Sequence, residues 1–232
     1  MADRPLALIV GANRGIGLGV AREFLARDWD VITTARVAAA ATELLSLARE
    51  HSGRMEISAL EMSDPTGIDQ FAAGLAGRTL DAMLVNAGVA GPAHRSASAA
   101  TIQETGELMF VNAIAPIRLG RALLGNLKAK TGVLGFTSSV MGSVALNAGG
   151  HELYRASKAA LNSLSRGLYA EMRGRSLTLL TLHPGWVRTD MGGSGAPVRV
   201  AESARGMVDM MLRASGDRRH AFLDYQGKEI AW

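Results

Sequence analysis

Short apolar runs alternate with longer amphipathic segments along the chain. The runs at residues 6–10 (LALIV) and 177–182 (LTLLTL) are almost continuously apolar, as parallel strands buried on both faces should be. Segments with apolar residues at helical spacing follow them. The alternation predicts an α/β fold in one domain, residues 1–232, with a doubly wound seven-stranded parallel sheet and helices on both faces.

The pattern assigns seven strands and six helices along the chain. The predicted strands are Leu6–Val10, Val31–Ala35, Glu56–Leu60, Ala82–Asn86, Gly132–Ser138, Leu177–Leu182 and Ala221–Leu223. The predicted helices are Gly15–Asp28, Ala41–Glu50, Thr66–Gly77, Thr101–Lys130, Leu153–Arg173 and Val200–Ser215. No repeat or linker interrupts this order, which favours a single domain.

Composition narrows the class of protein. The net charge of +4 is scattered and only 5% of residues are aromatic, so no nucleic-acid partner is expected. The chain has no cysteine, which excludes disulfides and thiolate metal sites. Its five histidines are dispersed, so no metal is expected. The apolar run near the N-terminus is far shorter than the ~18 residues of a membrane span. We therefore expect a cytoplasmic protein without a membrane partner.

A glycine-rich loop joins the first predicted strand to the first predicted helix. Its sequence from 11 to 17 is GANRGIG, a G-x-x-x-G-x-G variant of the dinucleotide-binding fingerprint. At a helix N-terminus, backbone N–H groups and the helix dipole can hold a pyrophosphate, and glycines permit its close approach. Glycines can also serve packing alone, so both interpretations stay open for the isolated loop.

The charge near the second predicted strand indicates which dinucleotide binds. An NAD site usually has a carboxylate near the tip of this strand, whereas an arginine accommodates the 2′-phosphate of NADP. Here the strand ends in Ala35-Arg36, Asp30 lies at its other end, and Arg14 supplies a second cation. Either arginine alone could be a solvated surface charge. Together they favour NADP(H).

Tyr154 and Lys158 are four residues apart at the start of a predicted helix. They project from one face of that helix, where an ammonium group would stabilise a phenolate and lower the tyrosine pKa from about 10. Such a tyrosine suits acid–base catalysis near neutral pH. The spacing also arises by chance on exposed helices, so the pair alone does not identify an active site.

Six motifs, in order, make the chain resemble the short-chain dehydrogenase/reductase family over nearly its whole length. They are the glycine loop with Val10 in place of a frequent threonine, Asn86-Ala87-Gly88, Asn112, Ser138-Ser139, Tyr154 with Lys158, and Pro184-Gly185-Trp186-Val187-Arg188-Thr189. The resemblance implies a Rossmann fold and an oxidoreductase that uses NADP(H). It also implies a small-molecule carbonyl or alcohol substrate.

The same resemblance implies the catalytic roles. Tyr154 would donate a proton to a carbonyl oxygen, and Ser139, in preference to Ser138, would hold that oxygen. Lys158 would bind the nicotinamide ribose and tune the tyrosine. Asn112 would anchor a water molecule of the proton relay.

The implied cofactor site extends over several loops. Thr189 and the Val187 backbone would contact the carboxamide, while Asn86 and Gly88 would line the adenosine ribose. Glu61-Met62 stands near the adenine, where the family usually has aspartate followed by valine. The whole predicted cofactor site consists of Gly11, Asn13, Arg14, Gly15, Ile16, Gly17, Arg36, Glu61, Met62, Asn86, Ala87, Gly88, Tyr154, Lys158, Pro184, Gly185, Val187 and Thr189.

Three segments make the chain similar to one branch of the family. The long loop Val140–Leu153, the segment from His183 to Gly193 and the terminal segment from Gly227 to Trp232 resemble those of sniffer-type carbonyl reductases and the myxobacterial C-factor. This implies reduction of a ketone, aldehyde or quinone. Alternatives are a nucleotide-binding signalling or regulatory protein of C-factor type, and an NAD-dependent alcohol dehydrogenase, which should carry an acid at position 35 or 36.

The surroundings of the site add three expectations. His151, three residues before the catalytic tyrosine, could touch the substrate. The glycine-rich segment Asp190–Val198 is a candidate mobile lid. The family resemblance implies a homodimer or homotetramer that pairs through the helices Thr101–Lys130 and Leu153–Arg173.

Overall fold

A seven-stranded parallel sheet organises the computed structural model, which describes residues 4–172 and 176–232. Its order is β3-β2-β1-β4-β5-β6-β7, and all neighbouring strands are parallel. The strands are β1 (Leu6–Val10), β2 (Asp30–Ala35), β3 (Met55–Ala59), β4 (Ala82–Val85), β5 (Val133–Thr137), β6 (Thr178–His183) and β7 (His220–Asp224). The predicted fold class is confirmed, and each predicted strand boundary lies within one residue of the observed one.

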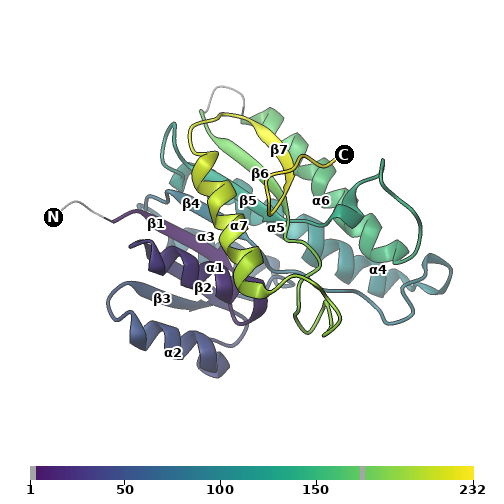
Figure 1. The fold of residues 1–232 in the computed structure, drawn as a ribbon, viewed down its shortest axis with the longest axis horizontal. Helices are drawn as coiled ribbons and strands as arrows, with labels where there is room; N and C mark the ends of the chain where they lie inside the picture. The colour runs from purple at the N-terminus through teal and green to yellow at the C-terminus, as the bar shows by residue number, and fades with distance from the viewer. Residues whose placement is uncertain (1–3, 173–175) are drawn as a thin grey trace.

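Helices cover both faces of the sheet (Figure 1). They are α1 (Gly15–Ala26), α2 (Thr42–Glu50), α3 (Pro65–Gly74), α4 (Ile102–Met109), α5 (Ala115–Ala122), α6 (Glu152–Glu171) and α7 (Val200–Arg213). One apolar core joins the sheet to α1, α2 and α7, and a second joins it to α3, α5 and α6. No helix among these described residues is long and apolar enough to cross a membrane.

Close helix contact explains one glycine. A Cβ atom at Gly19 would lie 2.9 Å from the Val200 side chain, so glycine lets α1 lie directly against α7. Figure 1 shows these two helices side by side over the sheet. Their contact brings the start of α7 next to the glycine loop.

The predicted helix Thr101–Lys130 is not continuous. It begins as α4 with a capping box of Thr101 and Glu104, passes through a π-helical segment, Phe110–Ile114, and resumes as α5. The Ala115 N–H bonds to the Phe110 carbonyl, five residues back. Pro116 has no N–H to direct at the Asn112 carbonyl. The regular helix ends at Ala122, and the end of the other long predicted helix, Arg173, lies outside the described residues.

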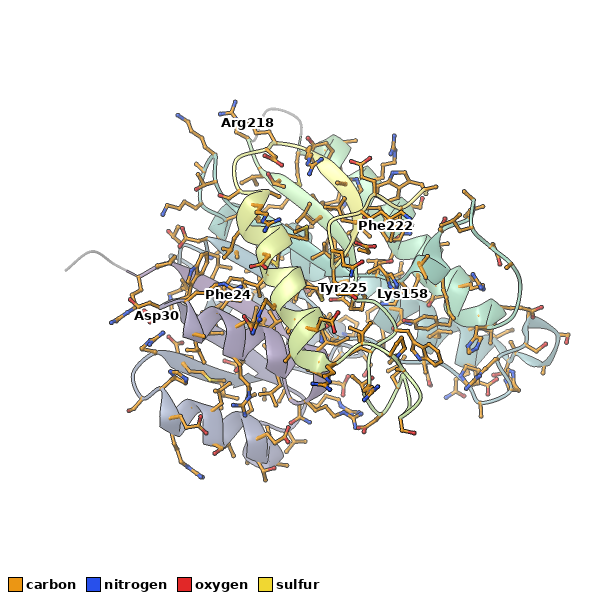
Figure 2. The ribbon with its side chains drawn as sticks, viewed as in Figure 1. Phe24, Asp30, Lys158, Arg218, Phe222 and Tyr225 are labelled. Carbon is orange, nitrogen blue, oxygen red and sulfur yellow. The ribbon has the colours of Figure 1, made fainter. Side chains whose placement is uncertain are left out.

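The carboxyl ends of the strands meet at one edge of the sheet. Strand order reverses between β1 and β4, and open α/β sheets bind ligands at such a switch point. Gly11 directly follows β1 and Asn86 follows β4. Asp30 begins β2 at the opposite edge, and Figure 2 shows it far from Lys158. The sheet therefore places the predicted motifs together and excludes Asp30 from their neighbourhood.

Candidate active site

The glycine loop is tightly fitted to its neighbours. Gly11 has φ +80°, and a Cβ there would lie 2.8 Å from the Ala87 Cα. A Cβ at Gly17 would lie 2.1 Å from the Gly11 carbonyl oxygen. Arg14, at the N-cap of α1, makes no side-chain hydrogen bond to the first turn. The loop thus packs closely against the strand ends and leaves the α1 N-terminus uncapped by its own side chain, as an anion site requires.

Two side chains fix this loop from either side. The Thr34 hydroxyl accepts the Gly11 N–H at 3.0 Å, and its carbonyl accepts the Ala12 N–H at 2.9 Å. Asn86 Nδ2 donates to the Gly11 carbonyl at 3.0 Å, and its Oδ1 accepts from the Thr137 hydroxyl at 3.1 Å. The protein therefore engages both polar atoms of the Asn86 side chain. Sequence reasoning missed Thr34; the signal is a buried threonine in an apolar strand.

The predicted adenosine end of the site is exposed. Arg14 forms an ion pair with Asp190, and both side chains are open to solvent. Arg36 is exposed and forms no ion pair with any residue that the structure describes. Glu61 is exposed beside buried Met62. The two arginines therefore differ: one has a carboxylate partner and the other does not.

The other residues of the glycine loop differ in their exposure to solvent. Asn13 is exposed, while Ile16 packs against the apolar core under α1. A Cβ at Gly15 would lie 3.2 Å from the Thr189 methyl carbon. The glycine loop therefore touches the segment that follows β6.

Lys158 lies inside the protein at this edge of the sheet. Its side chain is 3% exposed, and Nζ donates to the Thr137 carbonyl at 2.9 Å. A Cβ at Gly88 would lie 3.4 Å from that nitrogen. Burial lowers the pKa of Lys158 to about 8. The ammonium is thus beside the Asn86-Ala87-Gly88 loop and is mostly charged below pH 8.

Tyr154 lies in the first turn of α6, and its phenol is protonated at neutral pH. Burial raises the pKa of Tyr154 to about 12, and a hydrogen bond with the Ser139 side chain offsets this only in part. The direction is opposite to the predicted lowering. The reason is geometric: Lys158 Nζ lies over the tyrosine ring, 5.8 Å from its centroid, so burial of the phenol dominates. A protonated phenol is the form that can donate a proton.

The two adjacent serines face different partners. The Ser138 hydroxyl donates to Asn162 Oδ1 on α6 at 2.6 Å and is buried. The Ser139 hydroxyl accepts the Met141 N–H at 3.1 Å and bonds to the Tyr154 side chain. The structure therefore brings Ser139, and not Ser138, to the tyrosine.

Asn112 occupies the π-helical segment and connects three elements. Its Oδ1 accepts the Val89 N–H at 2.8 Å, and its Nδ2 donates to the Val89 carbonyl at 2.8 Å and to the Ser157 hydroxyl at 3.0 Å. Ser157 in turn donates to the Tyr154 carbonyl at 2.8 Å. Asn112 therefore holds the loop after β4 against the start of α6. Sequence reasoning missed Ser157, although it stands next to Lys158.

The segment after β6 is anchored on α7 and near the C-terminus. The Pro184 carbonyl accepts a hydrogen bond from the Ser203 hydroxyl at 2.6 Å. Gly185 has φ +85°, and a Cβ there would lie 2.9 Å from the Tyr225 ring. Val187 is buried. These contacts position the segment so that Thr189 lies against Gly15 of the glycine loop.

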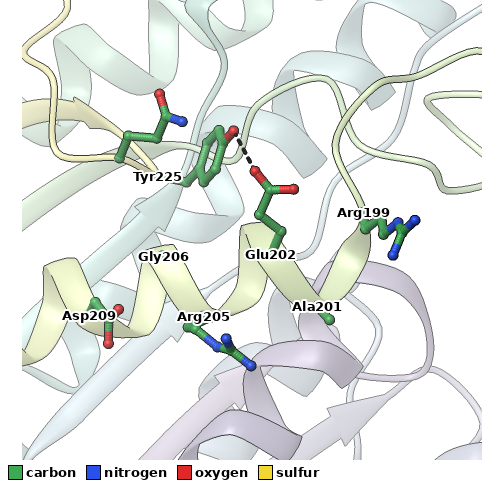
Figure 3. A pocket seen from close by; sticks show the side chains of 8 residues that line it. Arg199, Ala201, Glu202, Arg205, Gly206, Asp209 and Tyr225 are labelled. Carbon is green, nitrogen blue, oxygen red and sulfur yellow. Dashed lines mark hydrogen bonds between the residues drawn. The ribbon is translucent and has the colours of Figure 1, made fainter.

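An open hollow of about 500 Å³ lies beside α7, away from the predicted site. Figure 3 shows this hollow, in which the Tyr225 hydroxyl donates to Glu202 Oε1 at 3.1 Å. Its lining residues are Arg199, Ala201, Glu202, Arg205, Gly206, Asp209, Tyr225 and Gln226, none of which belongs to the predicted site.

His151, the predicted substrate contact, is the N-cap residue of α6. It has φ +50°, and its Nε2 lies 3.3 Å from the Arg95 guanidinium.

Residues 5–197 match the family model for short chain dehydrogenases. The chain belongs to the short-chain dehydrogenase/reductase family. It is therefore an oxidoreductase of this family, as the resemblance predicted. Within the described ranges, this dehydrogenase/reductase has no group of three His, Asp or Glu side chains placed to hold a metal ion.

Three relatives support the predicted branch of the family. The C-signal protein of Myxococcus xanthus is 35% identical over 166 residues, which cover 70% of this chain and 98% of that protein. A carbonyl reductase of Pseudomonas aeruginosa PAO1, crystallised in complex with NADP, is 40% identical with a TM-score of 0.92, and the match covers 99% of this chain and 100% of that one. The carbonyl reductase Sniffer of D. melanogaster is 29% identical with a TM-score of 0.90, over 99% of this chain and 100% of that one. The resemblance to the Sniffer and C-factor branch is confirmed.

Proposed function

We propose that this protein is an NADPH-dependent reductase of ketone, aldehyde or quinone carbonyls. The observation that carries the proposal is the meeting of Tyr154, Ser139 and Lys158 at one edge of the sheet, with the phenol protonated and the lysine buried beside it. The similar carbonyl reductase crystallised with NADP supports both the cofactor and the reaction.

The residues present fit a dinucleotide. Gly11 and Gly17 let the loop pack closely at the strand ends, since Cβ atoms there would collide with Ala87 and with the Gly11 carbonyl, and α1 begins without a side-chain cap. This helix N-terminus would hold the pyrophosphate. Lys158 would hold the nicotinamide-side ribose, and Arg14 and Arg36 would hold the 2′-phosphate. When bound, NADPH supplies the hydride for the reaction.

Tyr154 would transfer the proton. Its O–H donates to the carbonyl oxygen of the substrate while the carbonyl carbon accepts hydride, so a ketone becomes an alcohol. The Ser139 hydroxyl, already bonded to the phenol, would orient the same oxygen. The Lys158 ammonium would stabilise the phenolate that remains. Because the pKa of Tyr154 is raised, the phenol keeps its proton before the substrate binds.

Asn112 would help return a proton to Tyr154. Its side chain is engaged by Val89 and Ser157, so the group that would bind the water in this proposal is its backbone carbonyl. Pro116, four residues later, lacks the N–H that a regular α-helix would direct there. A water molecule on that carbonyl would connect Lys158 with solvent. The π-helical segment and the proline thus support the relay role implied by the family resemblance.

The direct test is reduction of a carbonyl panel. Ketones, aldehydes and quinones are offered with NADPH and with NADH, and the loss of cofactor absorbance is followed. We expect turnover of at least one class, with NADPH preferred. Binding of NADPH without turnover across the panel would favour the signalling alternative, for which the C-signal relative is the supporting observation. A preference for NADH would favour the alcohol dehydrogenase alternative.

We also propose that the protein forms a homodimer or homotetramer through α5 and α6. The outer surface near these helices carries exposed Ile114 and Leu164 beside exposed Ala156 and Gly167, so a second copy could approach closely. Multi-angle light scattering at micromolar concentration should give at least twice the monomer mass. A monomer under these conditions would contradict the proposal.

A further inference from the structure

One of the two arginines assigned to the phosphate already has an anionic partner. Arg14 belongs to the glycine loop, and Asp190 belongs to the segment after β6, 176 positions later. Their side chains, 65% and 72% exposed, form an ion pair across the space between the two loops. Arg36, the second phosphate arginine, has no such partner within residues 4–172 and 176–232.

The position of Asp190 is fixed by its own turn. The Thr189 hydroxyl accepts the Gly192 N–H at 3.1 Å, and the Thr189 carbonyl accepts the Gly193 N–H at 2.8 Å. The Trp186 indole donates to the Gly192 carbonyl at 2.8 Å. Thr189 itself lies against Gly15. The carboxylate therefore stands beside Arg14 because two ordered loops meet there.

We propose that Asp190 sets the preference between NADPH and NADH by competing with the cofactor's 2′-phosphate for Arg14. The inference rests on the proposed function, in which Arg14 binds that phosphate. A phosphate group must replace the carboxylate on Arg14 and then remain close to its negative charge. NADH has no 2′-phosphate and does not enter this competition. Asp190 therefore weakens the binding of NADPH and leaves that of NADH unchanged.

The exposure of the pair sets the size of the effect. Exposed ion pairs are weak because water and salt screen them, so an arriving phosphate can displace the carboxylate. Neutralising Asp190 should tighten NADPH binding about two- to fivefold, the range expected of one exposed pair. The same change should slow the release of NADP⁺, since no carboxylate at position 190 then competes with the 2′-phosphate for Arg14.

The test is direct titration of cofactor binding. NADPH and NADH fluorescence is measured with the wild type, Asp190→Asn and Asp190→Glu at one ionic strength. Asp217→Asn is the matched control, because it removes the same charge from an exposed pair with Arg219 at 3.1 Å, outside the proposed site. We expect Asp190→Asn to lower the Kd of NADPH two- to fivefold without changing that of NADH. Asp190→Glu should restore wild-type behaviour, and Asp217→Asn should match the wild type.

Three results would overturn the inference. They are an equal change for both cofactors, no change for NADPH, and weaker NADPH binding, which would mean that Asp190 holds Arg14 in its binding position. Failure of the underlying function has a different signature: the wild type itself would bind NADPH no better than NADH, whatever residue stands at 190.

Discussion

The nicotinamide end and the phosphate end of the proposed cofactor site are built in opposite ways. Lys158 and Asn112 are buried, and their polar side-chain atoms bond to partners inside the protein. Arg14 and Arg36 are exposed to solvent, and the ion pair of Arg14 with Asp190 joins two exposed side chains. Buried polar groups cannot exchange a lost partner for water, whereas exposed ones can. Substitutions should therefore have large effects at the first end and modest, salt-dependent ones at the second.

The largest effect is expected from Tyr154→Phe. The variant keeps the ring and removes the one O–H that would donate the proton, so kcat for carbonyl reduction should fall by about 10²–10⁴. NADPH affinity should change little. Steady-state kinetics with a good substrate and a fluorescence titration of NADPH measure the two quantities. Reduction at the wild-type rate by a variant that melts like the wild type would contradict the assigned proton donor.

Lys158→Met should lose both activity and cofactor affinity. The ammonium is proposed to hold a ribose and to stabilise the phenolate, and a charge-assisted hydrogen bond contributes roughly 1.5–3 kcal/mol, or tenfold or more in Kd. Lys128→Met is the matched control, since Lys128 is exposed and pairs with Asp81 at 2.8 Å. Loss of kcat with an unchanged Kd for NADPH would remove the ribose contact from the proposal.

Arg36→Asp probes the exposed end. The wild type should show about tenfold or more higher kcat/KM with NADPH than with NADH, because one charge-assisted phosphate contact is worth at least ~1.4 kcal/mol. The aspartate should reverse this preference by repelling the 2′-phosphate. Arg49→Asp, the same charge change at an exposed position on α2, should leave the ratio unchanged. Equal efficiency with both cofactors in the wild type would refute the assignment.

The smallest of these four effects is a pH dependence from Lys158. Its pKa of about 8 means that the ammonium loses its proton between pH 7 and 9, so kcat/KM for NADPH should fall about tenfold over that range. The titration of Lys158 does not itself destabilise the fold over this range. Because the pKa lies below its ordinary value, the unfolded chain binds more protons from about pH 8 to 10.5, and the free energy of unfolding contributed by this lysine rises with pH there. A flat profile would show that the charge of Lys158 does not control binding.

The sequence predicts the sheet closely because strands buried on both faces permit few alternatives. β1 occupies the predicted residues, and each other strand boundary differs by at most one residue. The break at Phe110–Ile114 was missed since helical periodicity continues through it. The break depends on Pro116 and on the hydrogen bonds of Asn112 to Val89, 23 residues away.

In the candidate site too, local sequence motifs could be predicted, whereas contacts between distant segments could not. Local motifs place the residues of the glycine loop and of the Tyr154 turn at the correct edge of the sheet. Their partners come from distant segments, as with Thr34 for Gly11 and Asp190 for Arg14, and no local pattern reveals them. The predicted shift of the tyrosine pKa had the wrong sign because the spacing of two residues does not report how deeply a phenol is buried.

The π-helical turn at Phe110–Ile114 means that deletion of one residue there would affect the regularity of the helix and the position of Asn112 in opposite ways. Such a turn holds one residue more than an α-helical turn. Deleting a residue within it would allow an uninterrupted α-helix from α4 to α5, but it would remove the wider turn from which Asn112 bonds to Val89. A shortened descendant could thus gain regularity and thermal stability while losing its chemistry. Under the relay role proposed for Asn112, a relative that is one residue shorter between positions 110 and 114 should therefore have lost this relay.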